Sequence, residues 1–124
     1  MTTKNKETGL LGEKLAANFL ESQNWKIIKR NWQYKQWEID LIARKNDCLL
    51  FAEVKTFDFG FVLPPVQKMG RSKLRSLAQG AEAWLSLNDF EGQIRFDLLY
   101  VLMQQQPPEV IHYEDVWFPN NWGR

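Results

Sequence analysis

Two apolar segments flank a short polar pair in the first half of the chain, and this arrangement constrains the fold more than any other feature. The segments are Glu38–Ala43 and Cys48–Thr56, and Asn46 and Asp47 lie between them. Asn and Asp are common in turns, because their side chains hydrogen-bond to nearby backbone and tolerate left-handed φ angles. The sequence therefore predicts a β-hairpin of two antiparallel strands with its turn at this polar pair.

The rest of the chain adds two helices and three further strands. Apolar residues recur at helical spacing in two segments, one near the N-terminus with Thr8 as its expected N-cap and one after Ser72. Helices are expected over residues 8–23 and 72–87, and strands over residues 25–30, 38–43, 48–56, 94–103 and 110–113. The order α-β-β-β-α-β-β predicts an α/β protein with a mixed central sheet flanked by helices.

Length and composition favour one soluble domain. The chain has 124 residues, of which 44% are hydrophobic and 25% are charged, and this size is typical of one domain. We expect a single domain over residues 1–124, with residues 1–7 as a flexible N-terminal tail. The polar N-terminus lacks a secretory signal, and no apolar run is long enough to span a bilayer. A cytoplasmic protein without a membrane partner is expected.

The chain contains one cysteine, Cys48, and one histidine, His112. An internal disulfide and a Cys/His zinc site are therefore excluded. A Ser-His-Asp triad would need His112, and no Ser lies in a recognisable nucleophile turn. A single His in a late strand is more often a structural residue than a ligand.

Four charged residues interrupt the predicted hairpin, with Glu38 and Asp40 in the first arm and Glu53 and Lys55 in the second. Side chains alternate between the faces of a strand, so the two charged residues of each arm share a face. Pairing about the predicted turn places Asp40 opposite Glu53 and Glu38 opposite Lys55. Directly opposed residues have Cβ atoms about 4.5–5.5 Å apart.

The pair of Asp40 and Glu53 suggests chemistry, because facing carboxylates repel each other unless a cation lies between them. With so few Cys and His residues the ligands would be mainly carboxylates, which favours Mg²⁺ or Mn²⁺. Lys55 would then orient a water molecule or stabilise developing charge, as phosphodiester hydrolysis requires. The alternative is a structural set of cross-strand pairs on an exposed face, and the spacing alone leaves it open.

A longer pattern resembles the YraN-like family, a group of small bacterial proteins in the PD-(D/E)xK, or restriction-endonuclease-like, superfamily. The resemblance runs from about Leu11 to Phe118. Its motifs are Gly12-Glu13, Arg30-Asn31-Trp32, Glu38–Ala43, Glu53–Thr56 and Arg95-Phe96-Asp97.

The resemblance implies a restriction-endonuclease-like core and a metal-dependent nuclease similar to the Holliday-junction resolvases. Asp40 and Glu53 would be metal ligands, Lys55 the catalytic lysine, and Glu13 an additional acidic ligand for Mg²⁺ or Mn²⁺. Glu38 would lie behind these ligands and support them. The expected substrate is DNA rather than RNA, and branched or otherwise structured DNA in particular. The superfamily often acts as dimers, so a homodimer is one expected state.

Basic residues gather around the predicted start of the second helix. Residues 66–75 contain four basic side chains and no acid, and a helix N-terminus favours anions. Arg71, Lys73 and Arg75 are therefore candidate nucleic-acid contacts, together with Lys68. A solvated basic loop is the alternative.

Two other functions remain open beside the nuclease. One is a nucleic-acid-binding module that keeps the nuclease fold but has little activity of its own. The other is a protein-interaction domain that uses the aromatic C-terminus, with Trp117, Phe118 and Trp122, and in which the charged hairpin has only a structural role.

Overall fold

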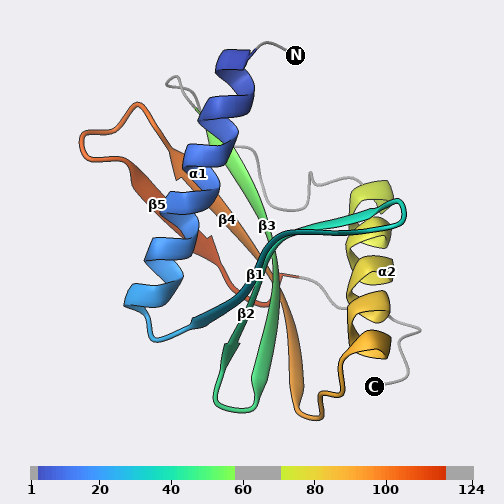
Figure 1. Cartoon of the computed structure of the whole chain (residues 1–124). Helices are drawn as coiled ribbons and strands as arrows, with labels where there is room; N and C mark the ends of the chain where they lie inside the picture. Colours follow the sequence, from blue (N-terminus) through green and yellow to red (C-terminus); the bar gives the residue numbers. More distant parts are fainter. Residues whose placement is uncertain (1–2, 58–70, 117–124) are drawn as a thin grey trace.

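The computed structural model describes residues 3–57 and 71–116, and it contains two helices and five strands (Figure 1). One sheet holds all five strands in the order β1-β2-β3-β4-β5. The central strands β3 and β4 are parallel, and the other neighbours are antiparallel. The predicted element order and the mixed sheet are confirmed. The elements are α1 (Thr3–Ser22), β1 (Lys26–Tyr34), β2 (Trp37–Lys45), β3 (Cys48–Phe57), α2 (Arg71–Leu87), β4 (Gln93–Leu102) and β5 (Glu109–Tyr113).

The helices cover opposite faces of the sheet (Figure 1). On one face, α1 contributes Ala16, Ala17 and Leu20 to a core that includes the inward side chains of β2, β3 and β4. On the other face, α2 contributes Leu77, Ala81 and Trp84. The strands β3 and β4 are buried on both sides, which explains why both read as nearly continuous apolar runs.

The sheet forks where β2 leaves β3. Their ladder ends at the pair of Leu41 and Ala52, whereas β2 stays paired with β1 as far as Trp37. Figure 1 shows this end of β1 and β2 reaching across to α2. The Trp37 indole donates a hydrogen bond to Gln79 of α2 at 3.1 Å. Gly80 allows the approach, because a Cβ there would lie 3.3 Å from Trp37 and from Ile39.

Two predicted boundaries are wrong. Helix α1 begins at Thr3, so Thr8 is not its N-cap, and the predicted flexible tail is helical from Thr3 onwards. Apolar periodicity detects only the part of a helix that packs on the sheet, whereas Lys and Glu extend a helix without burial. Strand β1 runs to Tyr34, four residues beyond the predicted end at Arg30, because its far half stays paired with β2 as far as Trp37.

Among the described residues, no helix is long and apolar enough to cross a membrane. The aromatic residues Trp117, Phe118 and Trp122 and the basic residue Lys68 lie outside the described residues.

Candidate metal-binding active site

The predicted hairpin register is confirmed from the turn to Leu41 and Ala52, but the ladder ends there and the predicted direct pairing of Asp40 with Glu53 is not part of it. Strands β2 and β3 pair from Lys45 and Cys48 to Leu41 and Ala52, and Asn46 adopts the left-handed φ of 55° in the turn. Beyond the last pair, β3 has no backbone partner in β2. The Val54 backbone amide of β3 donates a hydrogen bond of 2.8 Å to the Asp40 carboxylate instead. Asp40 therefore lies in the fork between β2 and β3, beside Glu53.

Glu53 is a buried carboxyl group beside another acid. Its residue is 7% exposed. Burial, together with the hydrogen bond and charge of the neighbouring Asp40, raises the pKa of Glu53 from its usual 4.5 to about 8. The predicted convergence of Asp40 and Glu53 is thus present in the fold, and without a cation it disfavours the ionised form of Glu53.

Helix α1 brings a third carboxyl group, Glu13, to the same fork. Gly12 permits this approach, because a Cβ there would lie 2.1 Å from Oγ1 of Thr56 in β3. Burial and the charge of Asp40 raise the pKa of Glu13 to about 7. Its interactions with Asn31 and Asp40 leave Oε1 buried without a hydrogen-bond partner.

These three carboxyl groups fit a hard divalent cation in their chemistry, because Mg²⁺ and Mn²⁺ prefer oxygen ligands. The free Oε1 of Glu13 and the raised pKa values of Glu13 and Glu53 are what a carboxylate cluster lacking a cation would show. However, among the described residues no three acidic, His or Cys side chains form a metal-binding group as they stand. A cation would require the carboxylates to close around it.

Lys73 of α2 brings a positive charge to these carboxyl groups. Its Nζ lies 3.1 Å from Oε2 of Glu53, so this side chain, predicted as a nucleic-acid contact, is directed at the carboxylates instead. The reason is tertiary, since the first turn of α2 lies over the end of β3. Arg75 is exposed on the same helix, and the side chain of Arg71 is outside the described part of the chain.

Lys55 is exposed, two residues beyond Glu53. The predicted pairing of Glu38 with Lys55 is wrong, because the β2–β3 ladder ends before them and Glu38 pairs with Gln33 of β1. Glu38 nevertheless remains near the site, since its charge acts on both Glu13 and Lys73.

Asn31 is a site residue to which the sequence assigned no role. Its side chain hydrogen-bonds to Glu13 and lowers the pKa of that carboxyl group. Asn31 has a φ of 50° and lies between two paired residues of β1, Arg30 and Trp32, without a partner of its own in the ladder. An Asn within an otherwise strand-like segment was the available signal, because Asn is enriched at left-handed positions.

A second polar cluster surrounds the fully buried Asp97 of β4. Arg95 donates two hydrogen bonds to its carboxylate, at 3.1 and 2.7 Å, and the Asp115 amide donates another at 2.9 Å. His112 bonds to the same carboxylate, a contact that is consistent with the expected structural role. These partners tie β4 to β5 and to the turn that follows it.

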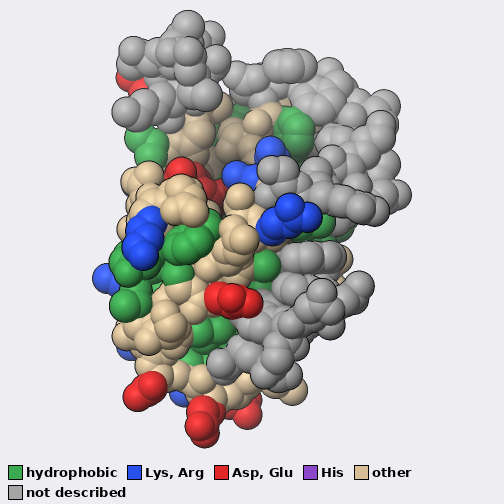
Figure 2. Space-filling view, turned by 90° about the vertical axis from the view of Figure 1, so that its right-hand side faces the viewer, with side chains coloured by type: hydrophobic (Ala, Val, Ile, Leu, Met, Phe, Trp, Pro, Cys, Tyr) green, Lys and Arg blue, Asp and Glu red, His purple; other side chains and the backbone are tan. Residues whose placement is uncertain are grey.

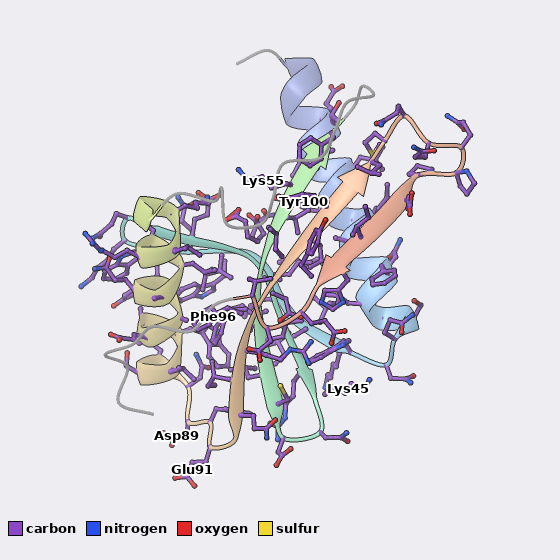
Figure 3. All side chains as sticks on the ribbon, turned by 180° about the vertical axis from the view of Figure 1, so that it is seen from behind. Lys45, Lys55, Asp89, Glu91, Phe96 and Tyr100 are labelled. Carbon is purple, nitrogen blue, oxygen red and sulfur yellow. The ribbon has the colours of Figure 1, made fainter. Side chains whose placement is uncertain are left out.

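Charged side chains lie at both ends of the sheet. Lys55 and Tyr100 lie at one end, and Lys45, Asp89 and Glu91 lie at the other (Figure 3). In Figure 2, acidic side chains border Lys and Arg side chains in the upper part of the described surface, and further acidic side chains gather at its lower end. Acidic and basic side chains thus occur at both ends of the sheet.

The chain is similar to a family described as "Uncharacterised protein family UPF0102", which it matches over residues 12–101. This range contains all the predicted site residues from Glu13 to Arg75. The match confirms the resemblance to the YraN-like family.

Three curated relatives, each named UPF0102 protein, illustrate the similarity. The protein of Flavobacterium johnsoniae is 35% identical, over 93% of this chain and 97% of its own. That of Dictyoglomus turgidum is 36% identical, over 94% and 97%. That of Geobacter metallireducens is 34% identical, over 90% and 93%.

Proposed function

This chain belongs to the protein family UPF0102, and we propose that it is a metal-dependent nuclease that hydrolyses phosphodiester bonds in DNA. The observation that carries the proposal is the meeting of Glu13, Asp40 and Glu53, from three different elements, in the fork of the sheet. A fold gains no stability from a carboxylate that raises the pKa values of two neighbouring carboxyl groups. A cation would remove this repulsion, which supports a role in binding one.

Each side chain has a distinct role in this proposal. Asp40 and Glu53 hold the cation, and Glu13 contributes its free oxygen. A bound Mg²⁺ or Mn²⁺ supplies Lewis acidity and makes a water molecule more acidic. Asn31 orients Glu13, and the hydrogen bond from Val54 orients Asp40. Lys55 directs its ammonium group at the attacking water or at the charge that develops on the phosphate.

The proposed substrate is DNA, and structured DNA such as a four-way junction is included. The basic side chains of Arg71 and Arg75 on α2 are proposed to contact the phosphates beside the reacting one. Lys73 would join them once a cation takes its place beside Glu53.

A second function is a nucleic-acid-binding module with little activity. The contact of Lys73 with Glu53 favours it, because an ammonium group already lies beside the most deeply buried of the three carboxyl groups, where a cation would have to bind. In such a module the pair would stabilise the fork, and the basic residues of α2 would bind phosphates without cleavage.

The test is cleavage of plasmid, single-stranded and four-way-junction DNA with Mg²⁺ or Mn²⁺, using wild type beside the Asp40→Asn and Lys55→Ala variants. The nuclease predicts cleavage by wild type that EDTA and both substitutions abolish. Arg30→Gln on β1 serves as a charge control that should cleave normally, since among the described residues Arg30 pairs only with Glu21, at 3.9 Å.

Cleavage that persists in both site variants would contradict the assigned residues. Salt-sensitive binding by wild type without cleavage under any condition would instead support the binding module.

A further inference from the structure

A basic pocket lies at the end of the sheet remote from Lys55. Its volume is about 640 Å³, and its lining residues are Asn24, Lys26, Arg44, Lys45 and Asn46. Asn24 and Asn46 lie in the turns before β1 and after β2, Lys26 begins β1, and Arg44 and Lys45 end β2. Three of the five carry a positive charge, and none carries a negative charge.

Two of the positive charges in this pocket lie opposite each other. Lys26 and Arg44 are direct cross-strand partners, whereas Lys45 follows Arg44 in the chain, so its side chain leaves the other face of β2 and reaches the pocket from there. Like charges opposite each other destabilise a sheet. Among the described residues, no carboxylate forms an ion pair with any of the three. Asp47, in the adjoining turn, is exposed and does not line the pocket.

Two of the three cationic groups are held in place by their neighbours. The Lys45 ammonium donates to the Gln23 carbonyl at 2.9 Å and lies 5.8 Å from the Trp25 ring centroid. The Arg44 Nε donates to the Asn46 carbonyl at 3.0 Å, and the guanidinium lies 5.1 Å from the Phe90 ring centroid. Among the described residues its terminal nitrogens form no ion pair. A guanidinium group fixed in this way is suited to binding phosphate through two donors.

We propose that this pocket is a second phosphate-binding site, which takes a backbone phosphate of the nucleic acid whose other part lies at the carboxylates. The choice of ligand rests on the proposed function, whereas the pocket and its charge do not. Cys48 of β3 lies opposite Lys45 and therefore marks the pocket end of that strand. Lys55 is seven residues further along β3, which corresponds to roughly 23 Å. A duplex that reaches both ends must therefore span about seven base pairs, at 3.4 Å each.

The test measures binding of a labelled 20-base-pair duplex and a four-way junction by fluorescence anisotropy, in EDTA so that cleavage plays no part. The Lys26→Gln/Arg44→Gln variant should bind at least tenfold more weakly than wild type near 100 mM salt. The slope of log affinity against log salt should fall by about one to two. Lys29→Gln/Arg30→Gln, with the same loss of charge on β1 outside the pocket, is the matched control and should lose much less.

Equal weakening in the two double variants, or no weakening in either, would overturn the proposal. Circular dichroism establishes that each variant is folded, and Arg44→Lys, which keeps the charge, should retain more affinity than Arg44→Gln. Inorganic phosphate is titrated separately and followed by the NMR shift of the Asn46 amide. A phosphate response with unchanged DNA affinity in the pocket variant would overturn the assignment to nucleic acid. Normal cleavage in that case leaves the proposed nuclease intact, whereas absent DNA binding by wild type contradicts both proposals.

Discussion

The Nζ atom of Lys73, in the first turn of α2, lies 3.1 Å from Oε2 of Glu53 on β3. This contact places a positive charge against the carboxylate that is most deeply buried in the fork. The Lys73 side chain is half exposed, whereas the Glu53 side chain is 9% exposed. The lysine can therefore move into solvent, but the carboxylate cannot.

Lys73→Gln should strengthen the response of the protein to Mn²⁺. In wild type a cation must displace the ammonium group from Glu53, and in the variant it need not. The rise in Tm on adding Mn²⁺, measured by differential scanning fluorimetry at pH 8, should be larger for Lys73→Gln than for wild type. Arg75→Gln on the same helix should respond as wild type does. A smaller response in Lys73→Gln would show that the lysine assists cation binding rather than competing with it.

Asp40→Asn should stabilise the metal-free protein and abolish its response to Mn²⁺. The amide keeps an oxygen that can accept the Val54 hydrogen bond, but it removes the charge that raises the pKa values of Glu13 and Glu53. Chemical denaturation at pH 8 should give a higher free energy of unfolding than wild type. A lower value would mean that Asp40 serves mainly to hold the fork together.

The stability of the metal-free protein should fall as pH rises from about 5 to 8. The pKa values of Glu13 and Glu53 are raised from 4.5 to about 7 and 8, so in this window the folded state binds more protons than the unfolded state. The free energy of unfolding therefore decreases with pH. Urea titrations at half-unit pH steps measure it, and saturating Mn²⁺ should flatten the slope. A slope of the opposite sign would exclude these two raised pKa values.

Gly12→Ala should destabilise the protein and weaken Mn²⁺ binding together. The added Cβ would meet Oγ1 and Cγ2 of Thr56 at 2.1 and 3.0 Å, and rotation of a branched Thr side chain cannot clear both atoms. Overpacking of this kind costs about 1–3 kcal/mol, and the shift of α1 would displace Glu13. The double variant Gly12→Ala/Thr56→Ala should recover part of both losses. Gly9→Ala is the control, since no atom lies within 4 Å of its added Cβ.

Asp97→Asn should destabilise the fold by about 3 kcal/mol, because it leaves Arg95 without its buried partner. Although burial alone would raise the pKa of Asp97, hydrogen bonds from His112, Arg95 and the Asp115 amide hold it below its usual 3.8. A lowered pKa contributes stability above pH 3.8 that is lost as pH falls through the folded-state value. Acid unfolding of wild type below pH 4 should therefore be steeper than that of the variant. Equal steepness would contradict the lowered pKa.

The local pattern of the sequence was sufficient to predict the hairpin, the element order and the meeting of Asp40 with Glu53. These features depend on strand alternation, on a turn at Asn46 and on apolar periodicity, all of which act over a few residues. The register could be predicted because a shift of one residue would have moved the side chains of two mostly buried strands to the opposite face of the sheet. The role of Glu13 as a site residue was indicated only by the resemblance to a family, since nothing in the local sequence distinguishes it from a solvated glutamate beside an apolar stripe.

The tertiary structure alone decided which charges meet. Lys73 contacts Glu53 rather than facing solvent, Asn31 contacts Glu13, and Lys26, Arg44 and Lys45 converge on one pocket. Each of these contacts depends on the angle at which a helix crosses the sheet or on where β2 leaves β3. Packing of residues far apart in the chain sets those geometries, whereas sequence periodicity specifies only which face of its own element a side chain occupies.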